Sequence, residues 1–464
     1  MQSLRLYSVL FISALATSCM ADLDVKPTEN IDQSVAFSSV DDLNAGVLGV
    51  YAAISTHSIS VSSLLSDENM WPLENNTGRG ILAFSWKQDG LTSDVIAAWA
   101  NFYQVLDRAN RILAVIDGVY ATSLEEPAKR QMKGELLALR AFCHLELLRH
   151  YAVDYAPASP GIPLMLRSEI GKPGRDTVRK VYEQINTDLA TAKTLIPATF
   201  TNRNRITGLA VSAIQARAAL WQEDWDAAIA ASTEVIEAMP LADRAEFPEI
   251  WLDRSNAEVV WKLKREAQDA KFGDFYRDGS NRVLFAPSFK LIAAFDAVND
   301  VRFNAYVKDL AAGEPVRRWT VNKYTGGQAA LVNLADIKLF RVAEMYLIRA
   351  EAYAAKGVTG LVPGTKDLND LCAERIDGYL PQTFATSAAL VDAVLLERYR
   401  ELAFEGHRYF DLRRKGRNVE RWPEDVIQAP TALTLTPDDR GYYIPIPVRE
   451  RQANENISEH PKYE

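Results

Sequence analysis

The chain has 464 residues, of which 48% are hydrophobic and 24% charged, and its formal net charge is −9 at pH 7. This length is sufficient for a large buried core, and an acidic surface argues against nucleic acid as the binding partner. The three cysteines, at positions 19, 143 and 372, have no spacing that is typical of a structural metal site.

The first 18 residues have the three parts of a secretory signal. One arginine, Arg5, precedes the apolar run 6–16, and small residues lead to Cys19. The run is too short to span a bilayer, so residues 1–18 are expected to be a lipoprotein signal peptide. Cys19 stands at the cleavage point, where its thiol is expected to be lipidated. Each buried methylene of an acyl chain would contribute about 0.8 kcal/mol to anchoring. The alternative is an ordinary signal peptide with a chance cysteine.

Residues 19–34 are polar and acidic and are expected to form a tether to a single domain at 35–464. Two regions of that domain, 55–95 and 240–335, lose helical periodicity and are predicted to be long loop regions. Elsewhere the spacing of apolar residues predicts helices and two short strands. The predicted helices span 40–54, 99–116, 129–151, 178–196, 335–356, 368–376 and 388–414, with two more between 209 and 238, and the predicted strands span 258–264 and 442–447.

The pair of helices at 209–238 fits a tetratricopeptide repeat. Ala216 and Ala228 fall where two helices need small residues to cross closely, and Asp224 falls at the turn between them. Ser232 departs from the pattern, and a generic helical hairpin is the alternative. Stacked pairs of this kind bury a continuous core between neighbours. The predicted fold class is therefore mostly α, a tetratricopeptide-like scaffold of helix pairs with long loop insertions and a few short strands.

Sequence motifs for catalysis are missing from the chain. The five histidines have no zinc-ligand spacing, and no nucleophile elbow, phosphate loop or dinucleotide fingerprint occurs. We therefore expect no metal, no cofactor, no catalytic residue and no enzyme. Cys143 lies in a helical apolar pattern that favours a buried free thiol, with a Cys143–Cys372 disulfide as the alternative.

Glu397, Glu401 and Glu405 recur every four residues and share one face of a predicted helix, with arginines interleaved. Two carboxylates about 5–9 Å apart across a bound sugar would be the acid and base of a glycosidase. Three carboxylates on one stripe beside arginines are explained more simply as ion pairs. The segment with Asp296, Asn299 and Asp300 lacks the alternating carboxylates and central glycine of a calcium loop, so no calcium site is predicted there.

Segments along the whole mature chain carry one family pattern. They are Cys19 with Asp22-Leu23-Asp24 and Pro27; Trp99, Tyr103 and Asn110; Leu139-Arg140-Ala141-Phe142 with Gly161-Ile162-Pro163-Leu164; residues 341–352 and 396–414; and Tyr443-Ile444-Pro445-Ile446-Pro447. These segments resemble the SusD/RagB family of nutrient-binding outer-membrane lipoproteins. The chain departs from the pattern at Glu459, His460 and Lys462, and the matching motifs concern the scaffold more than the ligand.

The resemblance implies a SusD-like fold, an ion pair between Asp300 and Arg302, whose segment looks like the family's Phe…Asp-x-Arg motif, and a function. The protein would sit on the outward face of the outer membrane, capture oligosaccharides or peptides non-covalently, and deliver them to a SusC-type TonB-dependent transporter. A lipid-anchored helical-repeat scaffold that binds a protein or peptide in the periplasm is the alternative. A lipid-anchored glycoside hydrolase is a third hypothesis.

Aromatic residues in the two loop regions are the candidate ligand contacts. Sugar rings present apolar C–H faces that stack on aromatic rings, while amides and arginines hold the hydroxyls. The alternative for each residue is that it covers the core under a long loop. The resemblance implies that ligand binds on loops of these two regions. The candidates are Trp71, Asn75 and Trp86 in the first region, and Phe272, Phe275, Tyr276, Arg277, Trp319 and Tyr324 in the second.

Overall fold

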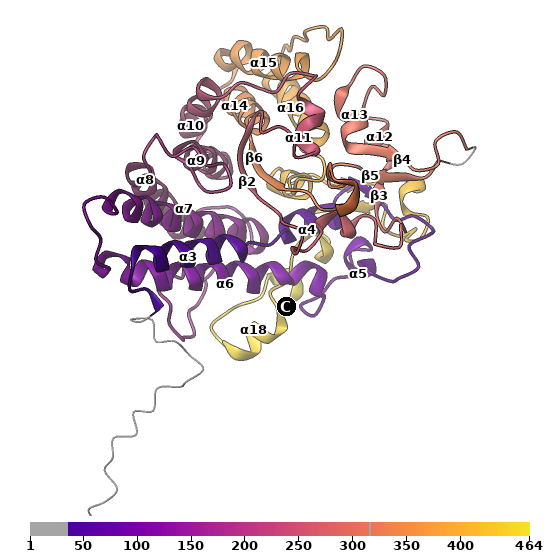
Figure 1. Ribbon diagram of the computed structural model, residues 1–464. Helices are drawn as coiled ribbons and strands as arrows, with labels where there is room; N and C mark the ends of the chain where they lie inside the picture. Colours follow the sequence, from indigo (N-terminus) through magenta and orange to yellow (C-terminus); the bar gives the residue numbers. More distant parts are fainter. Residues whose placement is uncertain (1–35, 315–316) are drawn as a thin grey trace, which may run out of the picture.

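The computed structural model describes residues 36–314 and 317–464 (Figure 1). The predicted signal peptide at 1–18, the predicted lipidation site Cys19 and the predicted tether at 19–34 lie outside these described residues. Within the two described ranges the chain is mostly helical, and its strands form four antiparallel sheets of two strands each. This is the fold class that the sequence predicts.

Long helices form the scaffold, and short helices and strands occupy the loop regions. The longer helices are α3 (Val40–Ala52), α4 (His57–Leu65), α6 (Ser93–Val115), α7 (Glu126–Tyr151), α8 (Val178–Leu195), α9 (Gly208–Gln222), α10 (Trp225–Ala238), α14 (Val342–Ala355), α15 (Val358–Ala373) and α16 (Ser387–Glu401). The short helices are α5 (Ile81–Phe84), α11 (Phe247–Trp251), α12 (Phe289–Ile292), α13 (Val301–Tyr306), α17 (Arg408–Arg414) and α18 (Val448–Ala453). The paired strands are β1 (Asn69–Met70) with β3 (Ala286–Pro287), β2 (Val259–Leu263) with β6 (Ile337–Arg341), β4 (Val307–Asp309) with β5 (Trp319–Val321), and β7 (Val419–Glu420) with β8 (Thr434–Leu435).

Side-chain caps fix where α8, α9 and α10 begin. Thr177, Thr207 and Asp224 each accept a hydrogen bond from the backbone N–H three residues further along. A cap of this kind typically stabilises a helix by about 1 kcal/mol. Helix α9 ends at Gln222, and the left-handed φ of 56° at the next residue, Glu223, turns the chain into α10 within two residues. The turn predicted at Asp224 is therefore present.

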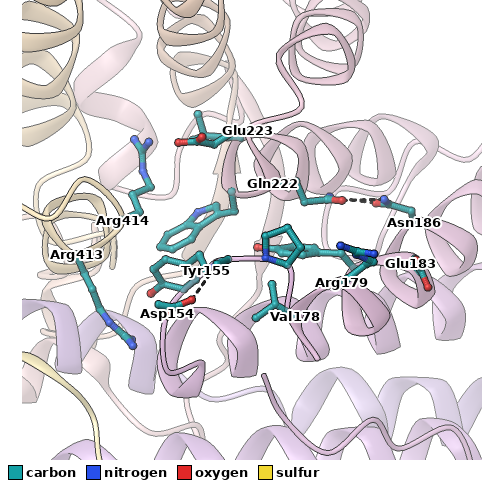
Figure 2. Close-up of a pocket in the computed structure, with 15 residues that line it drawn as sticks. Asp154, Tyr155, Val178, Arg179, Glu183, Asn186, Gln222, Glu223, Arg413 and Arg414 are labelled. Atoms are coloured by element: carbon teal, nitrogen blue, oxygen red, sulfur yellow. Dashed lines mark hydrogen bonds between the residues drawn. The ribbon is translucent and has the colours of Figure 1, made fainter. Parts of the chain in front are cut away.

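Helices α6 to α10 stack beside one another in chain order, and α14 and α15 continue the stack (Figure 1). Ala216 of α9 and Ala228 of α10 are fully buried in this stack. Their small side chains let ridges and grooves of neighbouring helices approach closely. Figure 2 shows a cross-link between neighbouring pairs, in which the Asn186 amide of α8 donates to the Gln222 side chain of α9 at 3.1 Å.

Two helix boundaries in the C-terminal half differ from the prediction. The helix predicted at 335–356 is helical only from Val342, because the residues before it pair with β2 and form β6. The helix predicted at 368–376 begins earlier, at Val358, and includes Pro363. Glycine and proline in its first half weaken the helical pattern, and packing against α14 overrides that weak propensity.

Three further predictions need correction. The helix predicted at 388–414 is two helices, α16 and α17, because Phe404 and Gly406 have left-handed φ values of 64° and 85°. The strand predicted at 442–447 pairs with no other described segment and is not a strand. The loop region predicted at 55–95 contains α4, β1 and α5.

One described stretch, 40–65, is long and apolar enough to span a membrane by composition alone. In the structure it is divided between α3 and α4, and half of its most apolar window is buried, as in a core helix. Cys143 and Cys372 are both buried free thiols, so the alternative disulfide is not formed.

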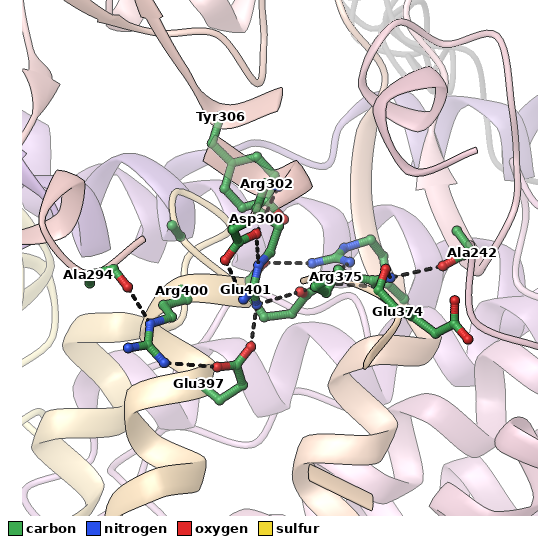
Figure 3. A network of polar contacts seen from close by, with 12 residues as sticks. Ala242, Ala294, Asp300, Arg302, Tyr306, Glu374, Arg375, Glu397, Arg400 and Glu401 are labelled. Atoms are coloured by element: carbon green, nitrogen blue, oxygen red, sulfur yellow. Dashed lines mark hydrogen bonds and ion pairs between the residues drawn. The ribbon is translucent and has the colours of Figure 1, made fainter. Parts of the chain in front are cut away.

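A buried ion-pair network joins the loop region at 240–335 to α16 and its C-terminal extension (Figure 3). The side chains of Glu397, Glu401 and Glu405 are almost completely buried in it. The N–O distances are 3.1 Å for Arg302–Glu401, 2.7 Å for Arg341–Glu401, 2.6 Å for Arg341–Glu405, 3.0 Å for Arg375–Glu401 and 2.7 Å for Lys323–Glu405, and Arg302 also pairs with Glu397. Asp300 and Arg302 pair at 2.8 Å, as predicted.

The network has a structural role, as the spacing of the three glutamates predicts. Burial alone would raise the pKa of Glu401, but Arg375, Arg341 and Arg302 outweigh it and hold that pKa well below its ordinary value. The carboxylate is therefore ionised and fully occupied by buried guanidiniums. This geometry gives no support to the glycosidase alternative, which needs carboxylates that face a bound sugar.

Candidate ligand-binding groove

A groove of about 470 Å³ lies where the two irregular regions meet. One wall is the end of α3 and the turn into α4, residues 52–57, and the other is the segment 265–275. Arg79 enters from the loop before α5. Both regions that the resemblance singles out for ligand binding therefore contribute to one concave surface, which we call the ligand groove.

Two phenylalanines form the aromatic part of the ligand groove. The rings of Phe272 and Phe275 are stacked, with centroids 5.9 Å apart and an interplanar angle of 6°. Phe272 is half-buried and Phe275 is 8% exposed, so the first ring offers most of the accessible surface. The Arg79 guanidinium lies 5.8 Å from the Phe275 centroid. An apolar ring beside a cationic hydrogen-bond donor suits a ligand with an apolar C–H face and hydroxyl groups, such as a sugar.

Hydroxyl, imidazole and charged groups surround these rings. The Ser55 hydroxyl lies 2.8 Å from Nδ1 of His57, and burial lowers the pKa of His57, so the ring is neutral at pH 7. Burial also lowers the pKa of the Arg265 guanidinium, against the opposing effect of Asp269. The charged side chains that line the groove are three bases and two acids: Arg79, Arg265, Lys271, Asp269 and Asp274.

Hydrogen bonds between the two irregular regions stabilise their relative positions. Arg318 forms a bidentate pair with Glu74, with N–O distances of 3.0 and 2.8 Å. Arg282 donates to the Asn76 side chain at 2.9 Å. Fixed loop positions reduce the entropy that ligand binding would otherwise cost.

Four of the predicted contact residues are interior residues. Trp71, Asn75, Tyr276 and Tyr324 are each at most 5% exposed. The Trp71 indole donates to the Asn75 carbonyl at 3.0 Å, and the Asn75 amide donates to the Leu284 carbonyl at 2.7 Å. These side chains hold the loops together and present almost no surface to a ligand, which agrees with the alternative interpretation that they cover the core.

The other five predicted residues keep some accessible surface. Trp86 is half-buried, with its indole N–H donating to the Leu65 carbonyl at 3.1 Å. Trp319 and Arg277 are also half-buried, and neither lines the ligand groove. Of the nine predicted residues only Phe272 and Phe275 line it. Ligand contact by these five residues stays a prediction.

Several groove residues were not among the predicted contacts. Lys271 belongs to the segment Lys271-Phe272-Gly273-Asp274-Phe275, whose alternation of aromatic and charged residues was the available signal. Ser55 and His57 lie just after a predicted helix, where a turn exposes polar side chains. Among the described residues no group of His, Cys, Asp or Glu could hold a metal ion.

Comparison with known proteins finds the same type of protein along the whole chain. The model of the SusD family matches residues 304–463, and a second family model, described as starch-binding associating with outer membrane, matches residues 23–220. The SusD-like protein P25 of Formosa agariphila is 23% identical over 98% of this chain and 97% of its own length.

Solved structures show the same fold. A SusD superfamily protein from Bacteroides thetaiotaomicron has a TM-score of 0.80 and 22% identity, covering 91% of this chain and 100% of its own. A SusD-like carbohydrate-binding protein from Bacteroides vulgatus has a TM-score of 0.77 and 23% identity, covering 91% of this chain and 98% of its own. The sequence motifs, the helical scaffold and these matches together show that the chain belongs to the SusD/RagB family of non-catalytic binding proteins.

Proposed function

We propose that the protein is a lipid-anchored, outward-facing outer-membrane protein that captures an oligosaccharide in the ligand groove and delivers it to a SusC-type TonB-dependent transporter. The ligand groove is the observation that carries this proposal. It joins an accessible aromatic face to hydroxyl, guanidinium and carboxylate groups, the combination that recognises the C–H faces and hydroxyls of sugars.

Carbohydrate is favoured over peptide as the ligand. One matching family model is described as starch-binding, and one structural relative is a carbohydrate-binding protein. None of the residues that line the described groove belongs to a strand, so the groove offers no strand edge of the kind that binds extended peptides. A peptide ligand remains the competing outcome of the binding test.

Phe272 and Arg79 are the residues to change first. We expect the Phe272→Ala and Arg79→Ala variants each to lower affinity for the best glycan of a panel by about tenfold or more, because truncating a central contact typically costs over 1 kcal/mol. The panel contains neutral and acidic polysaccharides and oligosaccharides, and binding is measured by affinity electrophoresis and calorimetry.

Matched surface variants separate loss of binding from loss of fold. Arg130→Ala removes an exposed arginine on α7, and Leu124→Ala removes a leucine that is 89% exposed. Both should bind glycan like the wild type. The ligand groove is rejected if all four variants bind equally well, and a carbohydrate ligand is rejected if peptides bind while every glycan fails.

Location and delivery need their own test. The pattern of Cys19 followed by acidic residues supports lipidation and an outward-facing anchor. Cys19→Ala should release the protein from the membrane fraction, and protease added to intact cells should digest the wild type. If lipidated protein stays protected in intact cells, the periplasmic scaffold replaces surface capture. Co-purification with a TonB-dependent barrel tests the delivery step.

A further inference from the structure

A second cavity, larger than the ligand groove, lies away from it in the helical scaffold (Figure 2). It measures about 680 Å³ and is bounded by the loop after α7, the first half of α8, the end of α9 and two residues of α17. We call it the scaffold pocket. Its volume falls within the range of about 300–1,000 Å³ that is typical of small-ligand sites.

Aromatic rings form the inner wall of the scaffold pocket. Tyr155 is half-buried, and its ring packs edge-on against Trp221 with centroids 4.8 Å apart and an interplanar angle of 78°. The Tyr155 hydroxyl donates to the Arg149 carbonyl at 2.8 Å, which fixes the ring in place. A ring that is held on one side and accessible on the other provides a rigid stacking surface.

The electrostatics of this wall disfavour a cationic ligand. The guanidinium of Arg149 lies 5.2 Å from the Trp221 ring centroid, and that of Arg413 lies 5.2 Å from the Tyr155 centroid. Each ring therefore already interacts with one buried cation, which would repel a second cation that approached the pocket.

The formal charges that line the pocket cancel. Three acidic and three basic side chains contribute: Asp154, Glu183, Glu223, Arg179, Arg413 and Arg414. Neither an anion nor a cation gains from such a balanced lining. A neutral ligand with many hydroxyl groups, which can donate to carboxylates and accept from guanidiniums, fits it best.

Several polar groups of the scaffold pocket have donor or acceptor positions that a ligand could use. The Tyr182 hydroxyl is buried and has no hydrogen-bond partner among the described residues, and a buried hydroxyl without a partner is uncommon. The amides of Asn186 and Gln222 exchange hydrogen bonds of 3.1 and 3.4 Å at the pocket edge. Each amide keeps further donor and acceptor positions for a ligand.

We propose that the scaffold pocket is a second binding site, for a neutral oligosaccharide, separate from the ligand groove. This proposal rests on the proposed function only for the class of ligand, an oligosaccharide. Tyr155 would stack on one sugar ring, Tyr182 would pair with a hydroxyl, and Asn186 with Gln222 would hold a neighbouring sugar. A protein with two sites can hold one chain at two points and gain avidity without a larger single site.

The test compares variants of the two sites on the full mature protein. The probes are starch, laminarin, xylan and galactomannan in affinity gels, with hexasaccharides of the retained polysaccharide in calorimetry. We expect two binding sites in the wild type. Tyr182→Phe should weaken one site at least threefold, and the Asn186→Ala/Gln222→Ala double variant should weaken the same site at least tenfold. Phe272→Ala should leave that site intact.

Two variants guard against loss of fold. Tyr182→Phe removes only the hydroxyl, and Lys180→Ala changes an exposed residue of α8 that does not line the pocket. The proposal is overturned if no neutral probe binds, or if binding is unchanged in both pocket variants. Failure of the ligand groove gives a different pattern, in which Phe272→Ala binds as the wild type while the pocket variants lose affinity.

Discussion

Glu401 is the central carboxylate of the buried ion-pair network. The substitution Glu401→Gln removes its negative charge but preserves the size of the side chain. Glu401 contacts Arg302, Arg341 and Arg375 at 3.1, 2.7 and 3.0 Å. All four side chains are at most 1% exposed. Glutamine can still accept hydrogen bonds, but it leaves three buried guanidiniums with less negative charge than they now have.

The structure sets the expected magnitude. Breaking a buried ion pair by removing one partner costs about 3–5 kcal/mol. Arg302 and Arg341 each retain two other carboxylates, whereas Arg375 retains only Glu258 within the described chain. Because most of the positive charge stays compensated, we expect a loss of about 3 kcal/mol, the lower end of that range.

Urea unfolding of the mature protein, followed by circular dichroism, measures this loss. Glu237→Gln is the matched control, because Glu237 is an exposed glutamate on α10, and it should change stability by no more than about 0.5 kcal/mol. A loss below about 1 kcal/mol for Glu401→Gln would refute the reasoning, since the network would then contribute no more than a surface pair.

Two further predictions concern a buried carboxyl and a helix crossing. Burial raises the pKa of Glu68 to about 8, so the folded state holds a proton that the unfolded state releases near pH 4.5. The free energy of unfolding should therefore fall as pH rises from about 5 to 8, and Glu68→Gln should remove the part of this decline that Glu68 causes. If the pH dependence is the same in the variant and the wild type, Glu68 does not hold the proton. Ala216→Leu should cost about 1–3 kcal/mol by overpacking the α9–α10 contact, whereas Ala227→Leu, on the exposed face of α10, should be nearly neutral in thermal unfolding.

Scaffold features could be predicted from sequence because local signals and packing agree there. Ala216, Asp224 and Ala228 occupy repeat positions whose spacing follows directly from helix geometry. The ion pairs of Glu397 and Glu401 follow from the four-residue period that places charges on one face. Each of these predictions needs only residues that are close in sequence.

Other boundaries depend on contacts that are distant in sequence. Residues 337–341 read as the start of a helix, but β2, more than seventy residues earlier, pairs with them as a strand. The break between α16 and α17 arises at Phe404, where the backbone N–H donates to the buried Glu68 carboxyl group at 3.0 Å. A pattern within one segment carries no information about such partners.

Which loop aromatics stay accessible was the hardest feature to predict, for a physical reason. A long loop region must bury its own apolar surface and satisfy its backbone, so many of its aromatic side chains turn inward. Tyr276 and Tyr324 illustrate this, with parallel rings whose centroids are 6.0 Å apart inside the loop region. The accessible ring, Phe272, is a smaller residue at the edge of that cluster, 4.8 Å from the Tyr324 ring centroid.

The different burial of Trp71 and Trp319 allows a direct test of this explanation. Trp71 is 5% exposed and packs edge-on against Phe84, so Trp71→Ala should cost about 3–5 kcal/mol of stability. Trp319 is half-buried beside Phe303, and Trp319→Ala should cost about 1 kcal/mol. Thermal unfolding and glycan affinity are measured on both variants. If Trp71→Ala stays as stable as Trp319→Ala but loses ligand, the loop aromatics bind glycan directly and this explanation is wrong.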